Sequence, residues 1–309
     1  MDVDRSAGHA RMIPSWQPDA GSGMTVREIA VRGLSFEVIE AGAGDHLAIC
    51  LHGYPELAYS WRHQIPVLAA MGYRVWAPCQ RGYGATSKPE GIDAYRIEYL
   101  VADVAALFDA SGAKTLTLIG HDWGGAVAWS FAIHHVRPLD RLVIMNMPHP
   151  RCFARALRNW PQQRRSWYLA AYQAPELPER MLLRNDAAAL RQIFARHAVD
   201  PALFPEAVVD IYAAAAQRPG ALTAMLNWYR AVPLNPRPRW LPDNGRVDVP
   251  TLIVWGDEDK TLGLETLDRS DEFVSDLTIR RLKGVGHWVQ QEGAAQVNAA
   301  LEEWLPGGR

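Results

Sequence analysis

A carboxylate stands at the centre of a glycine-rich turn in this chain, Gly120-His121-Asp122-Trp123-Gly124-Gly125. The turn follows the apolar run 116–119 and precedes the apolar stretch 126–132, so we expect it to join a strand to a helix as a nucleophile elbow. Its small residues allow a sharp turn that holds Asp122 on a strained tip facing a cavity. An ionised Asp122 can attack without first losing a proton. The turn predicts a nucleophile, although an ordinary loop with a solvated Asp fits it about as well.

A second acid and a histidine follow late in the chain. Asp259 closes the turn Gly256-Asp257-Glu258-Asp259 after the run 251–255, and His287 lies in a Gly-rich segment after the run 278–282. Either residue alone is a weak signal, because such an Asp is usually a turn former. Their order, nucleophile then acid then histidine, is that of a triad in which the acid orients an imidazole that takes a proton from water. Asp257 stays open as the alternative acid, and Asp259 is favoured.

The elements that must position these residues alternate between strands and helices. Continuous apolar runs are typical of strands covered on both faces of a parallel sheet, and they occur at 47–51, 73–78, 116–119 and 142–145. A hairpin is expected at 26–40 with its turn at Gly33, and helices at 61–71 and at 95–111 before Gly112. The alternation predicts an α/β fold with a mostly parallel, doubly wound sheet. Functional groups lie at the carboxyl ends of such strands, so the three triad residues are expected to converge.

The composition of the chain changes after residue 148. Residues 149 to about 232 form Arg-, Ala-, Leu- and Trp-rich helical segments, and the five prolines of 233–250 indicate a return linker. Strand-like runs resume at 251. We therefore expect a loosely ordered N-terminal tail at 1–24, a core domain at 25–148 and 249–309, and a helical insertion with its linker at 149–248.

Charge and composition limit the possible partners. The chain has 32 basic and 34 acidic residues and a net charge of -2, which gives no electrostatic case for nucleic acid or an anionic membrane. Its three cysteines are far apart and predict neither a disulfide framework nor a metal site. No run is long and apolar enough to span a bilayer, and no signal peptide is recognisable. We expect a cytoplasmic protein, monomer or homodimer, that needs no cofactor or metal and binds a small neutral ligand.

Several segments resemble the soluble epoxide hydrolases of the α/β-hydrolase fold over about residues 26 to 305. In the core these are His52-Gly53-Tyr54-Pro55, 60–66, Arg81-Gly82-Tyr83-Gly84, 120–125 and 286–290. In the insertion, 167–173 and Leu226-Asn227-Trp228-Tyr229-Arg230 resemble the two cap tyrosine segments of that family. The resemblance implies an α/β-hydrolase fold with an inserted helical cap, or lid, in which Tyr168 and Tyr229 are the cap tyrosines. It also suggests a cis peptide bond before Pro55.

The implied chemistry is hydrolysis of an epoxide to a vicinal diol. Tyr168 and Tyr229 are protonated phenols at neutral pH and can donate to the epoxide oxygen as its bond to carbon breaks. Asp122 would form a covalent alkyl ester, which water activated by His287 would then hydrolyse. The backbone N–H groups of Trp123 and Tyr54 are expected to form the oxyanion hole. The expected partners are a small apolar epoxide and water.

The walls of the substrate pocket are less clearly marked in the sequence. His52, Pro55, Trp61 and Trp123 are predicted to line it, although a Trp beside a helix more often belongs to the core. The chain also departs from the family at Cys79, where relatives commonly have Asp in Pro-Asp-x-Arg-Gly. We interpret that Asp as structural, so its loss affects local hydrogen bonding rather than the mechanism.

Two other functions remain open. A haloalkane or haloacid dehalogenase uses the same Asp, His and acid, but a departing halide needs N–H donors such as the indole of Trp123, and two phenols would have no use. A catalytically silent binding protein would have no need of a general base behind an ionised carboxylate. An esterase is disfavoured because Ser is absent from the elbow.

Overall fold

The computed structural model describes residues 15–234 and 245–307. Within these ranges it contains an eight-stranded sheet in the order β1-β2-β4-β3-β5-β6-β7-β8. The strands are β1 (Thr25–Val31), β2 (Leu34–Ala41), β3 (His46–Leu51), β4 (Arg74–Pro78), β5 (Thr115–His121), β6 (Arg141–Met145), β7 (Thr251–Gly256) and β8 (Leu277–Leu282). β2 is antiparallel to both of its neighbours and all other neighbouring strands are parallel. The predicted mostly parallel α/β sheet is confirmed.

The local sequence explains the form of these strands. The side chains of β7 are all buried, and β3, β5 and β6 are buried after their first residue, which is why they are continuous apolar runs. The β1–β2 hairpin turns at Arg32 and Gly33, which have φ angles of 53° and 72°. Positive φ at both central residues matches the twist of the flanking strands.

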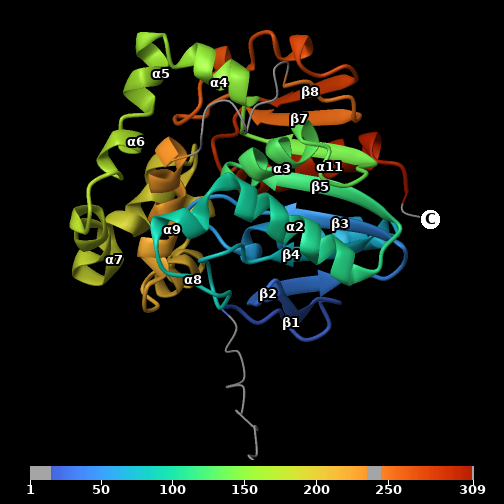
Figure 1. Ribbon diagram of the computed structural model, residues 1–309, viewed down its shortest axis with the longest axis horizontal. Helices are drawn as coiled ribbons and strands as arrows, with labels where there is room; N and C mark the ends of the chain where they lie inside the picture. The colour runs from blue at the N-terminus through green and yellow to red at the C-terminus, as the bar shows by residue number, and fades with distance from the viewer. Residues whose placement is uncertain (1–14, 235–244, 308–309) are drawn as a thin grey trace, which may run out of the picture.

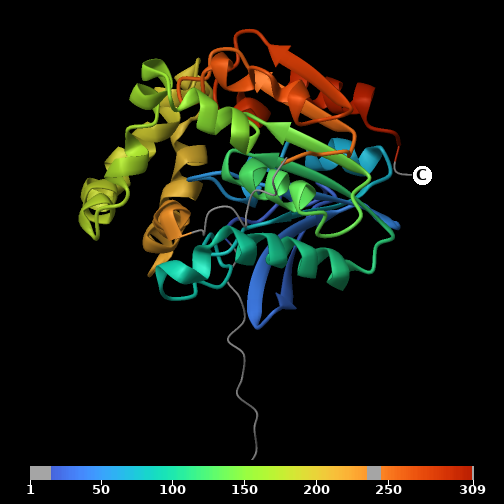
Figure 2. The same ribbon diagram turned by 45° about the horizontal axis from the view of Figure 1, so that its top comes forward.

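Helices cover both faces of the sheet (Figures 1 and 2). They are α1 (Ile65–Ala70), α2 (Ile97–Ser111), α3 (Trp123–Ile133), α10 (Val289–Glu292) and α11 (Ala294–Trp304). α2 and α3 lie in front of the sheet and α11 behind it in Figure 1. Asn298 of α11 donates from Nδ2 to the carbonyl of His63 over 3.1 Å, which places α11 beside the start of α1. α1 begins near Pro66 rather than at residue 61, because proline is tolerated only in the first turn.

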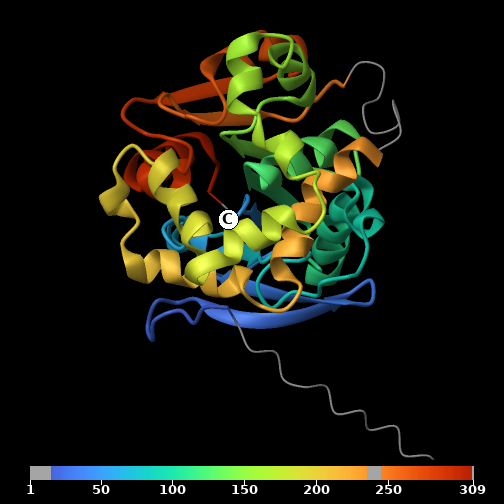
Figure 3. The same ribbon diagram turned by 90° about the vertical axis from the view of Figure 1, so that its left-hand side faces the viewer.

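Within the described residues, six helices lie between β6 and β7 in the sequence, in the stretch assigned to the cap. They are α4 (Pro150–Ala156), α5 (Trp160–Arg165), α6 (Tyr168–Ala171), α7 (Leu177–His197), α8 (Glu206–Ala216) and α9 (Ala221–Ala231). They gather at one end of the sheet, as Figures 1 and 3 show. α7 is interrupted by non-helical backbone at Arg184, Asn185, Asp186 and Ala187. Most of the predicted return linker, residues 235–244, lies outside the described residues.

Short 3-10 turns complete the chain, at η1 (Ala58–Trp61), η2 (Ile92–Tyr95), η3 (Pro201–Leu203), η4 (Val232–Leu234), η5 (Leu264–Leu267) and η6 (Ser270–Glu272). Among the described residues, no helix combines the length and the apolar character needed to cross a membrane.

The described part of the N-terminal tail is held against the core, which differs from the predicted loose tail at 1–24. Ser15 donates from Oγ to Oε2 of Glu37 on β2 over 2.8 Å. The ring of Trp16 packs against Tyr59, with centroids 4.8 Å apart. Polar tail composition alone does not reveal these two contacts; residues 1–14 lie outside the described residues.

Candidate active site

Asp122 occupies a strained turn between β5 and α3. Its backbone has φ 47° and ψ -122°, an unusual conformation for a residue with a side chain. The turn fits because Gly124 packs directly on the carbonyl of Leu51, where a Cβ atom would collide. The close approach of α3 to β3 therefore requires glycine at 124. The conformation projects the carboxylate beyond the carboxyl end of β5.

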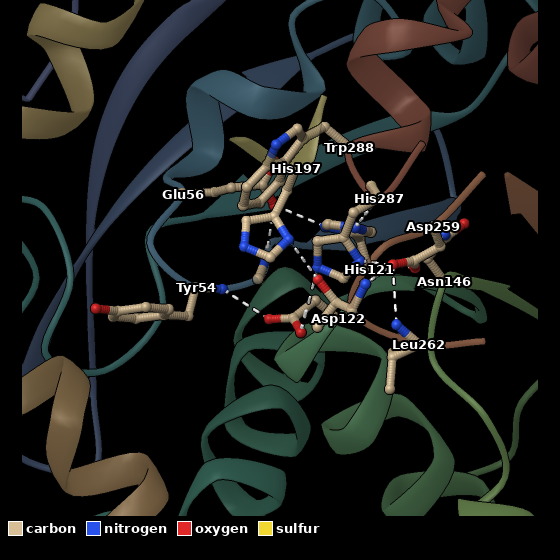
Figure 4. Close-up of polar contacts among 12 residues, drawn as sticks. Tyr54, Glu56, His121, Asp122, Asn146, His197, Asp259, Leu262, His287 and Trp288 are labelled. Carbon is tan, nitrogen blue, oxygen red and sulfur yellow. Dashed lines mark hydrogen bonds and ion pairs between the residues drawn. The ribbon is translucent and has the colours of Figure 1, made fainter. Parts of the chain in front are cut away.

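The two oxygens of the Asp122 carboxylate have different surroundings (Figure 4). Oδ1 accepts a hydrogen bond from the backbone N–H of Tyr54 over 2.8 Å. Oδ2 lies 3.8 Å from Nε2 of His287. Burial raises the pKa of Asp122, whereas the charges of His287 and His121 and the N–H groups of Tyr54 and Trp123 act against that rise. Oδ1 is thus held by the backbone, which leaves Oδ2 for chemistry.

His287 and Asp259 form a buried pair beside this carboxylate. Nδ1 of His287 lies 2.8 Å from Oδ2 of Asp259. Oδ1 of Asp259 accepts from the backbone N–H of Thr261 over 2.7 Å and of Leu262 over 2.9 Å. Nδ2 of Asn146 donates to Oδ2 over 2.6 Å. Burial by itself would raise the pKa of Asp259, but His287 and these donors bring it below its usual range.

Asp257, the alternative acid, lies elsewhere. Its carboxylate pairs with the exposed guanidinium of Arg281 on β8. Oδ1 of Asp257 lies 2.8 Å from Nε of Arg281. The geometry therefore places Asp259, and not Asp257, against His287.

The two acids allow a matched comparison. Asp259→Asn is expected to lower kcat by about 10⁴-fold, because an amide neither fixes the productive tautomer of His287 nor stabilises its charged form. Asp257→Asn makes the same chemical change at the surface and is expected to leave kcat within about twofold of the parent. Steady-state diol formation by both variants checks this. Equal losses in the two would contradict the role of Asp259.

The two neighbouring carboxylates favour the protonated form of His287. Burial lowers its pKa, but Asp259, the hydrogen bond between them and Asp122 together raise the pKa to about 9. Because Asp122 is one of these causes, any change that neutralises its carboxylate would lower the pKa of His287. A larger fraction of the imidazole would then be neutral and able to accept a proton.

Asp122→Asn is accordingly expected to lower the pKa of His287 from about 9 toward the ordinary value of about 6.5. The sign follows from the removal of a negative charge that stabilises imidazolium. Titration of the ring protons of His287 by NMR measures it, with Asp257→Asn as the control for a charge removed at the surface. An unchanged midpoint in Asp122→Asn would show that the two groups are not coupled.

Tyr168 and Tyr229 face the same cavity from two cap elements. Tyr168 begins α6 and Tyr229 lies on α9, and their ring centroids are 6.0 Å apart. With Asp122 and His287 they line a cavity of about 520 Å³. Burial, followed by the negative charge of Asp122, raises the pKa of both phenols well above the usual value. Both side chains are therefore protonated donors.

The residues predicted to line the pocket lie elsewhere. None of His52, Pro55, Trp61 and Trp123 is among the described residues that line this cavity. Trp61 is completely buried in η1, which packs on the sheet. Nε2 of His52 accepts from the backbone N–H of Gln80 over 3.0 Å, so that buried ring supports a loop. Pro55 follows a cis bond, and the Trp123 ring packs edge-on against Tyr229 with centroids 5.0 Å apart.

A second buried acid–histidine pair lies behind the site. Oε2 of Glu56 is 2.7 Å from Nδ1 of His121, and Nε2 of His121 is 2.8 Å from the carbonyl of His287. Both ring nitrogens therefore face oxygen acceptors, one from the Glu56 side chain and one from the backbone of His287. Glu56 also accepts from the N–H of Gly53 over 3.0 Å. The pair joins the loops that carry Tyr54, Asp122 and His287.

Glu56, His121 and Asn146 lie at the site but are not among the residues predicted for it from the sequence. Asn146 follows directly after β6, and its Oδ1 accepts from Gly256 over 3.0 Å. Asn146 could have been selected from the sequence, because it is a polar residue at the carboxyl end of a buried strand. His121 and Glu56 each lie one position from a residue already selected.

Cys79, where relatives commonly have Asp, lies beside Glu37 of β2. The Cys79 side chain is buried, and its backbone N–H donates to the carbonyl of Glu37 over 2.8 Å. The carboxylate of Glu37 accepts from the N–H of Ala85 over 2.7 Å. Glu37 on β2 therefore supplies an acceptor to the 79–85 loop, and the loop is hydrogen-bonded without an acid at 79.

Comparisons with known proteins agree with this geometry. The family model described as alpha/beta hydrolase fold matches residues 49–294. AB hydrolase superfamily protein YfhM of Bacillus subtilis is 37% identical over 92% of this chain and 98% of its own length. Epoxide hydrolase A of Mycobacterium tuberculosis is 35% identical, again over 92% and 98%. The structure of the Bacillus megaterium epoxide hydrolase with an inhibitor has a TM-score of 0.82 and 28% identity, covering 90% of this chain and 99% of that one.

Proposed function

Because the chain belongs to the α/β-hydrolase fold family, and within it to the epoxide hydrolases, we propose that it converts epoxides to vicinal diols through an ester on Asp122. The observation that carries this route is the split environment of the Asp122 carboxylate. Oδ1 is bound by the Tyr54 N–H, and Oδ2 is next to His287 in the cavity that both cap tyrosines line.

The first half-reaction opens the ring. Oδ2 of Asp122 attacks a ring carbon, the bond from that carbon to the epoxide oxygen breaks, and the oxygen takes a proton from Tyr168 or Tyr229. An alkoxide is a poor leaving group, so a hydrogen bond or proton at the oxygen lowers the barrier. Because Oδ1 remains bound to backbone N–H groups, Oδ2 becomes the ester oxygen and Oδ1 the carbonyl oxygen.

The second half-reaction releases the diol. Once the ester has removed the charge of Asp122, His287 releases its proton to solvent. The neutral imidazole then removes a proton from water, and the resulting hydroxide attacks the carbonyl carbon of the ester. The charge that develops on Oδ1 is next to the N–H group of Tyr54, and the N–H group of Trp123, which also interacts with this carboxylate, is the second expected donor. One such donor contributes about 3 kcal/mol to a comparable transition state. Collapse expels the diol as an alkoxide, which takes the hydroxyl proton of the new carboxyl group and leaves the carboxylate regenerated. The proton on His287 returns to the tyrosinate.

The cavity suits a small apolar epoxide. Many of its lining side chains are apolar, among them Ala171, Leu177, Pro178, Met181, Leu182 and Ile193. Such walls hold the carbon skeleton by burial, which leaves orientation to the polar groups of the site.

A parallel assay tests the assignment against dehalogenation. Styrene oxide and 1-bromobutane are supplied separately, and diol and bromide release are measured. We expect diol from the epoxide and bromide release at least 10²-fold slower, because two phenols protonate an alkoxide but a halide leaves as an anion. Bromide release that outpaces diol formation would instead indicate a haloalkane dehalogenase, and absence of both products would indicate a binding protein.

A further inference from the structure

A buried arginine lies next to one of the cap tyrosines. Arg230 follows Tyr229 on α9 and is 8% exposed. Its Nε donates to the carbonyl of Tyr172 over 3.1 Å, and its Nη2 donates to the carbonyl of Ala174 over 2.7 Å. Nη1 and Nη2 also donate to Oε1 and Oε2 of Glu179, over 2.7 and 2.9 Å. The guanidinium therefore donates to three partners, the carbonyls of Tyr172 and Ala174 and the carboxylate of Glu179.

Glu179 is a well-defined partner for this guanidinium. It lies in the first turn of α7, and its side chain is 13% exposed. Burial raises its pKa, but the hydrogen bonds and charge of Arg230 bring the pKa below the usual value, so Glu179 is ionised. A two-pronged guanidinium–carboxylate pair fixes orientation as well as distance, which a lysine does not.

The contacts of Arg230 connect the two segments that carry the cap tyrosines. Tyr172 and Ala174 belong to the short loop that leaves α6, the helix that begins at Tyr168. Gln173 in the same loop donates from Nε2 to the carbonyl of Tyr229 over 3.0 Å. Three hydrogen bonds therefore join the loop to α9, and their acceptors are the backbone carbonyls of Tyr172, Ala174 and Tyr229. The Tyr168 and Tyr229 rings, whose centroids are 6.0 Å apart, lie on the two segments that these hydrogen bonds join.

We propose that Arg230, held by Glu179, is a positioning residue that sets the two cap tyrosines at the separation needed to donate to one epoxide oxygen. The proposal rests on the proposed function, in which both phenols act on that oxygen. Arg230 itself is not among the described residues that line the cavity, so it acts through the tyrosines. A displacement of about 1 Å in a reacting group can slow a reaction about 10²-fold.

Ring opening can be measured alone in a His287→Gln background, where the ester accumulates. Arg230→Met and Glu179→Gln are each added to that background, and the rate of ester formation with styrene oxide is followed by mass spectrometry at several concentrations. The matched control is Arg191→Met, which removes a guanidinium of α7 that pairs with Asp186 and Asp210 on the exposed side of the cap.

The expected result is a fall of about 10²-fold in the saturating rate for Arg230→Met, with the half-saturating concentration little changed. Glu179→Gln should lower the same rate by a smaller factor. Arg191→Met should form ester at the rate of the His287→Gln background. Thermal melts show whether each variant folds. If Arg230→Met does not fold, the isosteric Glu179→Gln variant tests the proposal instead.

Two outcomes overturn the inference in distinguishable ways. Ester formation at the background rate in folded Arg230→Met or Glu179→Gln would show that the pair does not position the tyrosines. Absence of any ester in His287→Gln alone would contradict the covalent route itself, and with it this role of Arg230.

Discussion

His287→Gln is expected to stop turnover while a covalent ester accumulates on Asp122. Oδ2 of Asp122 attacks as a carboxylate and needs no base, so alkylation proceeds without the imidazole. Hydrolysis of the ester does need a base for water, and its loss should slow that step by about 10²–10⁴-fold. Intact-mass measurement should show an increase equal to the mass of the substrate. Peptide mapping should place the increase on the peptide that contains Asp122.

A second histidine in the same cavity provides the control. His197 also lines the cavity, with its ring centroid 6.4 Å from that of His287, but its Nδ1 lies 2.8 Å from Oγ1 of Thr261 and not against the buried acid. Burial, with a smaller effect of His287, lowers the pKa of His197 to about 4. His197→Gln should leave no persistent ester. Inactive His287→Gln with an unmodified Asp122 peptide would exclude the covalent route.

The parts of the site fixed by strand ends were predictable from the sequence. Asp122, Asp259 and His287 each follow an apolar run, and parallel strands place such positions at one edge of the sheet. The elbow was recognisable because its glycines allow backbone segments to approach closely, as the contact of Gly124 with the carbonyl of Leu51 shows. Geometry was then needed to separate Asp259 from Asp257, since both lie in one turn and only side-chain direction distinguishes them.

Packing between distant segments was not predictable. Trp61 is predicted to line the pocket, with the core as the alternative for a Trp beside a helix, and its position in η1 directs it into the core. The pairing of Glu56 with His121 joins residues 65 positions apart, and no local pattern records it. The break in α7 was not predictable either. Asn185, Asp186 and Ala187 have three successive positive φ angles, which local sequence preferences do not predict.

Replacement of both cap tyrosines is the change expected to affect ring opening most. Tyr168→Phe and Tyr229→Phe should each slow ester formation by about 10²-fold, and the double variant should approach the full contribution of a general acid, about 10⁴-fold. Phenylalanine retains the edge-on ring packing, so the loss reports the hydroxyl groups rather than the shape of the cavity. The rates are measured as ester formation in the His287→Gln background, where hydrolysis does not interfere.

Tyr172→Phe is the matched control for this pair, because its ring contacts both Tyr168 and Tyr229, with centroids 5.8 and 5.1 Å apart. Its hydroxyl accepts a long hydrogen bond from the hydroxyl of Tyr54 at 3.5 Å. If position in the aromatic cluster were sufficient, all three replacements would slow ring opening alike. If the donated proton matters, Tyr172→Phe keeps the rate, and the double variant loses it even though Asp122 remains an intact nucleophile. A double variant that forms ester at the undiminished rate would remove both phenols from the reaction and leave the electrophile without an acid.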